Sequence, residues 1–256
     1  MTLRILPSIF ALLLSFTLNL SHVTAQDLPW ANSAEEVGMS TERLARINDV
    51  VQRHIDAGNI QGAVTAVARR GKVVHFEAHG LMDVPNNRPM QEDSVFIMMS
   101  STKPVLGVAA MMMIEEGRIR PVDPVSKWIP EFADMQVAVL HEPLDENISP
   151  LRVDPDNIPP HRLVPAHRDI TIHDLLTHTA GLATGGLGTA ITERYQRQPG
   201  ATLESEMPYY ASFALDFQPG TRWQYSGGIG LDVVARIIEI ESGMSFEEFI
   251  RERIFE

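Results

Sequence analysis

The sequence predicts a mixed fold of the α/β class and of the α+β type, in which helices accompany an antiparallel pair of strands. Two short apolar runs flank a turn that contains glycine, as in a β-hairpin. Several longer segments have the apolar periodicity or continuous apolar character of helices. The 256 residues, 44% hydrophobic and 21% charged, are typical of a globular chain that forms one large domain or two small ones.

Charge and cysteine content exclude several functional classes. The formal net charge is −12, which argues against nucleic-acid binding through a general basic field. The chain contains no cysteine, so it has no disulfide framework, no thiolate nucleophile and no cysteine-based metal site. We expect no metal and no organic cofactor.

The first 25 residues resemble a secretory signal peptide. Met1–Arg4 is a short basic segment, Ile5–Leu20 is mostly apolar, and Val23–Ala25 offers small residues for cleavage after Ala25. A membrane anchor is the alternative, but the apolar run is shorter than the ~20 residues that a spanning helix needs. We therefore expect a secreted or periplasmic protein, not inserted in the membrane after cleavage, with a single domain over residues 26–256.

The N-terminal part of that domain predicts one helix and one hairpin. Residues 40–57 form an amphipathic pattern that Ser40 can cap and Gly58 can end. Residues 63–68 and 72–78 predict the two strands of the hairpin. Residues 80–90 are polar and contain two prolines, so we expect a turn region there.

The middle of the chain predicts a buried helix followed by irregular structure. Residues 101–116 are apolar on nearly every face, so we expect burial on all sides, with the methionines filling the core. Residues 133–169 contain six prolines and predict an irregular surface excursion.

Three capped or apolar segments predict the remaining helices. Thr171, with Asp174 three residues later, favours a short helix. Residues 231–240 predict a buried helix, and a capping box that starts at Ser245 predicts the last one. We expect the glycines at 185, 186 and 188 to form a mobile loop near the site.

A serine and a lysine stand one helical turn apart at the start of the apolar helix. Ser100 and Lys103 can share a face, so the hydroxyl and the amine can meet. A serine becomes an effective nucleophile when a base takes its proton, and the helix N-terminus can stabilise a developing oxyanion. The spacing alone leaves a second interpretation open, a capping serine beside a lysine that extends toward solvent.

The surrounding sequence resembles the serine β-lactamase and penicillin-binding-protein superfamily, in its class C-related serine hydrolase (esterase) branch. The resemblance runs from about residue 38 to the end of the chain. It is carried by segments 88–90, 94–96, 100–103, 123–125, 129–132, 171–182 and 219–226. It implies a β-lactamase/transpeptidase-like fold, with an antiparallel sheet flanked by helices and a helical subdomain.

The resemblance also implies roles for three residues. Ser100 would be the acyl-accepting nucleophile, Lys103 would help to deprotonate it, and Tyr225 would act as general base with its pKa lowered by Lys103. The family's Tyr-x-Asn motif has Gly227 at its third position here. The missing side-chain amide favours an esterase over a β-lactamase or a peptidase.

Other chemistries have little support in the sequence. His173, Asp174 and His178 could suggest a metal site or a triad, but the resemblance assigns them to a structural turn and helix. The chain has no His-Glu-x-x-His motif of a zinc hydrolase. It also lacks the Gly-x-Ser-x-Gly elbow of an α/β-hydrolase.

The family's third motif normally lies well beyond the tyrosine, and no counterpart occurs before Glu256. We therefore expect a C-terminally truncated chain with an incomplete sheet.

The favoured function is hydrolysis of small carboxylic esters through an acyl-enzyme, with β-lactams or D-alanyl peptides as further candidate substrates. The alternative is an inactive fragment of the same fold or a binding module. The expected partner is a small-molecule ester or amide, and the oligomeric state is left open.

Overall fold

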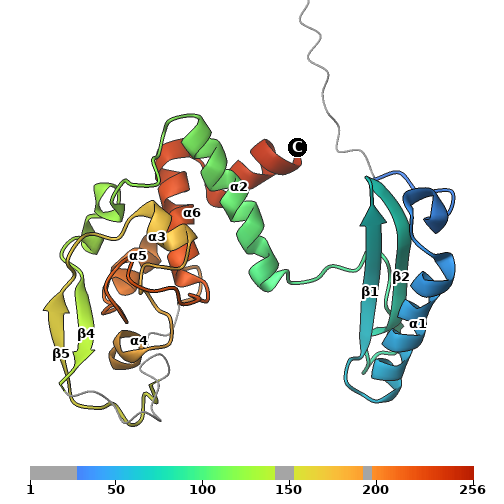
Figure 1. The fold of residues 1–256 in the computed structure, drawn as a ribbon, viewed down its shortest axis with the longest axis horizontal. Helices are drawn as coiled ribbons and strands as arrows, with labels where there is room; N and C mark the ends of the chain where they lie inside the picture. The colour runs from blue at the N-terminus through green and yellow to red at the C-terminus, as the bar shows by residue number, and fades with distance from the viewer. Residues whose placement is uncertain (1–27, 142–152, 193–197) are drawn as a thin grey trace, which may run out of the picture. The chain divides into compact units, whose positions relative to one another are not determined.

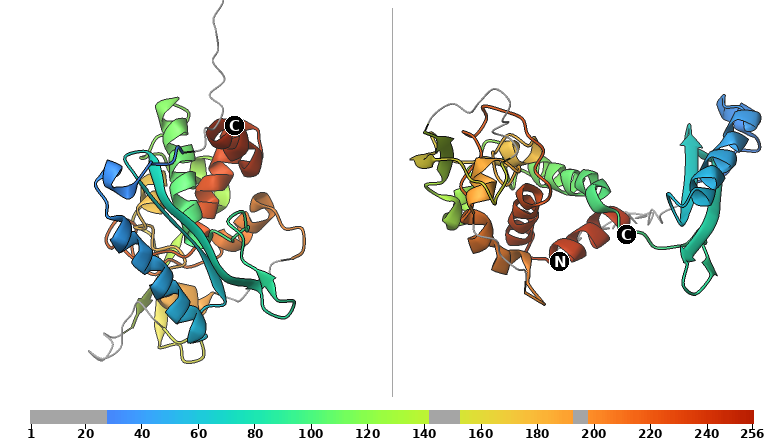
Figure 2. Two further views of the ribbon diagram at one scale, coloured as in Figure 1. Left: turned by 90° about the vertical axis from the view of Figure 1, so that its right-hand side faces the viewer. Right: turned by 90° about the horizontal axis from the view of Figure 1, so that it is seen from below.

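The computed structural model describes residues 28–141, 153–192 and 198–256. The chain divides into two compact units, Met1–Ser94 and Val95–Glu256 (Figures 1 and 2). The predicted signal peptide lies outside the described residues. Both candidate site segments, residues 100–103 and 225–227, belong to the second unit.

The first unit consists of one long helix and a small antiparallel sheet. Its elements are the 3-10 helix η1 (Ala34–Val37), the helix α1 (Thr41–Asp56) and the strands β1 (Gly62–Arg69), β2 (Lys72–Asp83) and β3 (Arg88–Pro89). The sheet order is β1-β2-β3. The predicted hairpin is confirmed: Arg70 and Gly71 both have positive φ angles, 53° and 73°, as the tight turn of a twisted hairpin requires.

Helix α1 begins as predicted. The Ser40 hydroxyl accepts a hydrogen bond from the backbone N–H of Arg43 at 3.3 Å, and Leu44 is buried. The helix lies along one face of the β1–β2 hairpin (Figure 1). The Asn48 side chain of α1 donates to Glu77 of β2 at 2.6 Å and fixes the helix on the sheet.

The expected turn region 80–90 is only partly correct. Strand β2 continues to Asp83, and Leu81 pairs with Pro89 of β3. The true turn is confined to residues 84–87. Pro89 is tolerated because β3 is an edge strand of two residues, where a missing N–H costs no ladder hydrogen bond.

The second unit is mainly helical and adds a two-stranded sheet. Its α-helices are α2 (Thr102–Glu115), α3 (Ile172–Leu176), α4 (Leu187–Ile191), α5 (Leu203–Ala211), α6 (Ile229–Ser242) and α7 (Phe246–Ile250). Its strands are β4 (Gln136–Leu140) and β5 (His161–Pro165). Its short helical turns are η2 (Met99–Ser101), η3 (Val125–Lys127), η4 (Pro130–Phe132) and the π-helical η5 (Arg251–Phe255).

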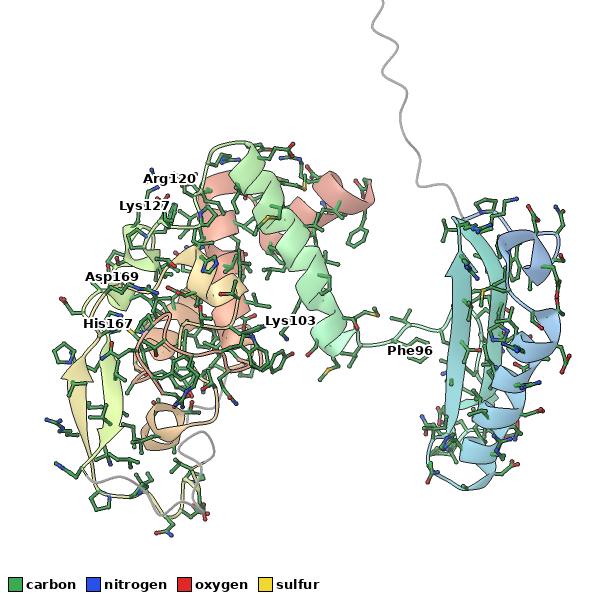
Figure 3. All side chains as sticks on the ribbon, viewed as in Figure 1. Phe96, Lys103, Arg120, Lys127, His167 and Asp169 are labelled. Carbon is green, nitrogen blue, oxygen red and sulfur yellow. The ribbon has the colours of Figure 1, made fainter. Side chains whose placement is uncertain are left out.

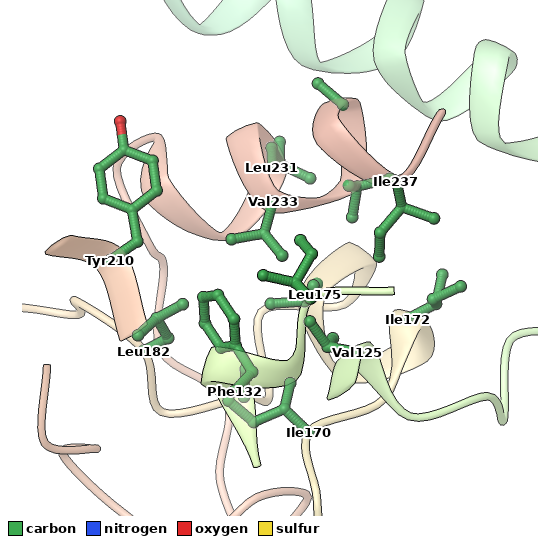
Figure 4. Close-up of a cluster of buried hydrophobic side chains, with 14 of the residues drawn as sticks. Val125, Phe132, Ile170, Ile172, Leu175, Leu182, Tyr210, Leu231, Val233 and Ile237 are labelled. Atoms are coloured by element: carbon green, nitrogen blue, oxygen red, sulfur yellow. The ribbon is translucent and has the colours of Figure 1, made fainter. Parts of the chain in front are cut away.

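The core of this unit surrounds α6. Val233 and Ile237 of α6 are fully buried and lie near Leu175 of α3, Val125 and Phe132 (Figure 4). The predicted helix over 231–240 is confirmed, and so is the capping box at Ser245 that starts α7. The apolar residues of α6 thus tie together segments that lie far apart in the sequence.

Helix α2 packs against α6 on one side only. Ala109, Ala110 and Met113 are fully buried in this contact, and the two alanines let the helices approach closely. Val108 and Met111 are 50% and 51% exposed. Within the second unit the expected burial on all sides is therefore found on one side only, because an apolar face is buried only where another element packs against it.

The expected irregular excursion over 133–169 contains a sheet. Strands β4 and β5 pair antiparallel from Gln136↔Pro165 to Leu140↔His161, and Val137 also bridges to Leu215. Residues 142–152 lie outside the described residues. The prolines obscured the strand signal, although Pro165 stands at the strand end, where the ladder tolerates it.

The predicted mobile loop at glycines 185, 186 and 188 is instead the start of α4. Gly186 is its N-terminal flanking residue, and Gly188 is buried inside the helix against the backbone of Ala214. Helix α5 was not predicted, because Pro208 lies within it. Thr202 and Ser205 nevertheless form a capping box at its start.

We predict that Gly188→Ala destabilises the protein. A Cβ there would stand 2.7 Å from the carbonyl carbon of Ala214, so α4 must move away. The expected loss is about 1–3 kcal/mol in the free energy of unfolding, measured by urea denaturation. The matched control is Gly107→Ala in α2, where a Cβ meets nothing within 4 Å. That variant should gain about 0.5–1 kcal/mol; equal effects of the two substitutions would contradict the close packing of α4.

Candidate active site

Ser100 and Lys103 lie together at the N-terminal end of α2. Ser100 belongs to the 3-10 turn η2. Lys103 is the second residue of α2 (Figure 3). Lys103 Nζ donates to Ser100 Oγ at 3.3 Å. The two side chains therefore meet as their spacing predicts.

The backbone just before the serine takes an uncommon conformation. Met99 has a φ of 47°, in the left-handed region that L-residues other than glycine, asparagine and aspartate seldom adopt. Such a conformation costs of order 1–3 kcal/mol and persists where the surrounding structure enforces it. The chain thus turns sharply into η2 and directs Ser100 toward the segment that carries Tyr225.

Tyr225 lies in the irregular segment between α5 and α6, and its hydroxyl reaches Ser100. The distance from Tyr225 Oη to Ser100 Oγ is 2.8 Å, within hydrogen-bonding range for two hydroxyl groups. Tyr225 is 42% exposed, and Ser100 is exposed as well. The structure therefore brings together all three residues that the sequence singled out.

Lys103 has a second partner that the sequence did not reveal. Its ammonium group donates to the main-chain carbonyl oxygen of Gly227 at 2.6 Å. The same position lacks the side-chain amide of the family motif, so residue 227 contributes here through its backbone. No side-chain pattern could have indicated this contact, because every residue carries a carbonyl.

The electrostatics favour the ionised form of the tyrosine. The pKa of Tyr225 is lowered below its ordinary value of 10.0. The largest cause is the hydrogen bond with Ser100, and the hydrogen bond and positive charge of Lys103 lower the pKa further. Lys103 Nζ lies 5.2 Å from the centre of the Tyr225 ring. A phenol with a lowered pKa is better able to accept a proton near neutral pH.

A cavity of about 250 Å³ opens beside these groups. Ser100, Lys103 and Gly227 line it together with the apolar side chains of Leu106 and Leu231. Binding sites for drug-sized molecules typically occupy about 300–1,000 Å³, so this cavity fits a smaller group.

Hydrogen bonds to Asp174 hold the segment around α3 in place. The buried carboxylate of Asp174 accepts hydrogen bonds from Arg168 at 2.5 and 2.9 Å and from the backbone and hydroxyl of Thr171 at 2.9 and 2.7 Å. Burial acts to raise the pKa of Asp174, but these hydrogen bonds outweigh it and lower the pKa below its ordinary value. Asp174 therefore has the structural role that the sequence analysis expected.

His178 also lies in the structural turn, but its ring contacts the site. The imidazole and the Tyr225 ring are 4.9 Å apart between centres and are tilted by 44°. Burial, and then the positive charge of Lys103, lowers the pKa of His178 below its ordinary value of 6.5. The family resemblance implies only the structural role of His178 in the turn.

The described parts of the chain contain neither a membrane-spanning helix nor a cluster of metal ligands. Across residues 28–141, 153–192 and 198–256, no helix combines the length and the apolar character needed to cross a membrane. Within the same ranges, no group of three or more His, Cys, Asp or Glu side chains is arranged to hold a metal ion.

Comparison with known proteins defines the class to which this fold and site belong. A family model described as Beta-lactamase matches residues 47–256. The chain therefore belongs to the beta-lactamase family of serine hydrolases, whose members similar to this chain include esterases and acyltransferases. The predicted family and the mixed α/β fold class are confirmed.

Several characterised proteins resemble the chain over most of its length. Esterase EstB from Burkholderia gladioli is 32% identical over 207 residues, which cover 78% of this chain and 45% of EstB. Lovastatin esterase from Penicillium rubens is 34% identical over 212 residues, which cover 80% of this chain and 49% of that enzyme. The chain thus spans about half the length of the curated relatives it matches.

The solved structure of EstCE1, a hydrolase with promiscuous acyltransferase activity, is also similar to this chain over most of its length. It superposes with a TM-score of 0.62 at 27% identity and covers 82% of this chain and 50% of EstCE1. The fold of the described residues is therefore that of the family.

We predict that Asp174→Asn lowers the free energy of unfolding by about 2–3 kcal/mol, because Arg168 and Thr171 lose a charged acceptor. Because the pKa of Asp174 is lowered on folding, its contribution is complete above its ordinary value of 3.8 and is lost as the pH falls through the folded value. Urea denaturation at neutral and acid pH measures both effects. The exposed Asp156→Asn is the control, and equal midpoints for the two variants would contradict the role of Asp174.

Proposed function

We propose that the protein is a serine hydrolase that forms an acyl-enzyme on Ser100. One observation carries the proposal: Ser100 Oγ lies 2.8 Å from Tyr225 Oη and 3.3 Å from Lys103 Nζ. A hydroxyl within hydrogen-bonding distance of a base, with a cation that favours the basic form of that base, is the arrangement that activates a nucleophile.

The proposed reaction uses Tyr225 as the proton carrier. Tyr225, as phenolate, accepts the Ser100 proton while Ser100 Oγ attacks the ester carbonyl carbon and forms a tetrahedral intermediate. The bond to the leaving oxygen then breaks, the alcohol takes the proton from Tyr225, and the acyl group remains on Ser100. Water repeats the sequence, which releases the carboxylic acid and returns the proton to Ser100.

Lys103 has an electrostatic role in this scheme. Its ammonium group donates to Ser100 Oγ and to the Gly227 carbonyl, so it stays fixed beside the reacting atoms. Its charge favours the phenolate of Tyr225 over the phenol. Ser100 at the N-terminal end of α2 also places the developing oxyanion near the positive end of that helix.

The proposed substrates are small carboxylic esters. The cavity of about 250 Å³ with Leu106 and Leu231 in its wall suits a short apolar acyl or alcohol group. The similar proteins EstB and lovastatin esterase are esterases by name. The glycine at position 227 leaves no side-chain amide for the acyl-amide of a β-lactam or a D-alanyl peptide, so these substrates are less favoured.

We further propose that the protein is exported and that the signal peptide is cleaved after Ala25. The basic start, the apolar run and the small residues before Gln26 support this proposal. The competing function, an inactive fragment of the fold or a binding module, predicts no activated serine and is separated by the next experiment.

We predict that a fluorophosphonate probe labels Ser100. The chain, expressed in a secreting bacterial host, is treated with the probe, and intact-mass and peptide-mass spectrometry locate the adduct. The intact mass also identifies the N-terminal residue, which should be Gln26. Lys103→Ala should slow labelling by ~10²-fold or more, because Tyr225 loses the hydrogen bond and the charge that favour its proton-accepting form.

Ser100→Ala should abolish the adduct, and Ser101→Ala should retain it, since the neighbouring serine has no role in the scheme. A folded wild-type chain that gains no adduct would favour the inactive alternative. An adduct that persists in Ser100→Ala would overturn the choice of nucleophile.

We predict that Tyr225 ionises below pH 10.0, its ordinary value, and that the labelling rate rises with pH through the same transition. The chain has four tyrosines, so subtracting the ultraviolet titration of Tyr225→Phe from that of the wild type isolates this one. Lys103→Ala should move the transition upward, because a hydrogen bond and a positive charge are lost. A difference titration centred at or above pH 10.0 in the wild type would refute this role for Tyr225.

A further inference from the structure

We propose that His178 is a positioning residue that holds Tyr225 against Ser100 through contacts on both sides of the tyrosine in the chain. The inference rests on the proposed function of Ser100 and Tyr225. It concerns a residue that follows α3, forty-seven positions before Tyr225, and that has no part in the proton transfers.

The backbone of His178 fixes the residue before Tyr225. The His178 carbonyl accepts a hydrogen bond from the N–H of Gln224 at 3.0 Å. One residue further, the Thr179 carbonyl accepts from the N–H of Gly220 at 2.9 Å. The turn that ends α3 thus binds the incoming part of the Tyr225 segment at two points.

The ring of His178 fixes the residue after Tyr225. Its Nδ1 accepts a hydrogen bond from the N–H of Ser226 at 3.3 Å. Ser226 is buried, so its N–H needs a partner inside the protein. Gln224 and Ser226 both form hydrogen bonds with His178. A single residue therefore holds the backbone on both sides of Tyr225.

The ring also supports the Tyr225 side chain directly. It lies 4.9 Å from the Tyr225 ring between centres, and it meets the exposed Trp223 edge-to-face at 6.5 Å. These distances are typical of aromatic pairs that contribute about 0.5–1.5 kcal/mol beyond simple burial. The backbone and the ring of Tyr225 are therefore held by the same imidazole.

The protonation state suits this role. A backbone N–H can only donate, so Nδ1 must be unprotonated to accept from Ser226. Burial and the charge of Lys103 lower the pKa of His178, which keeps the imidazole neutral at pH 7. The lysine that favours the phenolate of Tyr225 also favours the acceptor form of His178.

His178 itself is held in place by the end of α3. Its φ of 58° lies in the left-handed region, and the N–H of Thr179 donates to the Asp174 carbonyl at 2.8 Å to close the turn. Asparagine adopts this backbone conformation readily, and its Oδ1 occupies the place of a histidine Nδ1. Glycine adopts it without strain but offers neither ring nor acceptor.

Three variants separate the acceptor from the ring. His178→Asn keeps the acceptor, His178→Phe keeps an aromatic ring without it, and His178→Gly removes both. We expect His178→Phe and His178→Gly to slow fluorophosphonate labelling of Ser100 at least ~10-fold and His178→Asn to recover most of the rate. The exposed His173→Asn and His173→Phe on α3 are the matched controls and should behave as wild type.

A second measurement distinguishes positioning from simple loss of stability. The hydrogen bond to Ser100 is the largest cause of the lowered pKa of Tyr225, so displacement of the tyrosine should move its pKa upward. Each His178 variant is titrated in the ultraviolet, and the titration of the same variant with Tyr225→Phe added is subtracted. The difference gives the pKa of Tyr225 without depending on catalysis. Circular dichroism identifies folded variants, and His178→Gly serves if His178→Phe does not fold.

The outcomes separate this inference from the proposed function. An unlabelled wild type with an upward tyrosine shift in His178→Gly overturns the proposed function but supports the positioning. A labelled wild type with unchanged rate and unchanged tyrosine titration in His178→Gly overturns the positioning alone. Equal losses in His178→Asn and His178→Gly overturn the assignment of the Nδ1 acceptor.

Discussion

The hydrogen bond between Ser100 and Tyr225 joins two segments that are 125 residues apart, and it depends on how the helices beside these segments pack. Ser100 lies in η2, two residues before α2 begins, and Tyr225 stands four residues before α6. These two helices pack closely through buried alanines, and the apolar face of α6 forms the centre of the core. A displacement of ~1 Å between α2 and α6 would lengthen the bond beyond useful range.

One positive charge acts on the pKa values of two neighbouring side chains in the site. Lys103 is one of three lysines in an acidic chain, and its ammonium group is fixed by Ser100 and the Gly227 carbonyl. The charge favours the ionised form of Tyr225 and the neutral form of His178. A single cation therefore favours both the base for proton transfer and the acceptor for positioning.

Two aspartates supply the rigidity that the exposed site needs. Asp174 joins both ends of α3 through Arg168, Thr171 and Thr179. Asp216 plays a similar part at α4, where its carboxylate accepts from the backbone and hydroxyl groups of Thr184 and Thr189. Carboxylates that accept several hydrogen bonds hold loops in one conformation, because each bond restricts the same few backbone torsions.

The sequence by itself determined the features that depend on neighbours within about four residues. The cap at Ser40, the boxes at Thr171 and Ser245, the Arg70-Gly71 turn and the Ser100–Lys103 spacing are local, so their chemistry can be read directly from the order of residues. Tyr225 entered the site only through resemblance to a family, since nothing local links it to Ser100.

Tertiary structure decided the rest. Strand β4 depends on β5 and Leu215, and Gly188 is explained only by the backbone of Ala214. The Gly227 carbonyl and the His178 ring became part of the site because folding places them beside Lys103 and Tyr225. Contacts between distant segments arise from the packing of the whole core, and a carbonyl or a turn histidine carries no sequence signal of the partner it will meet.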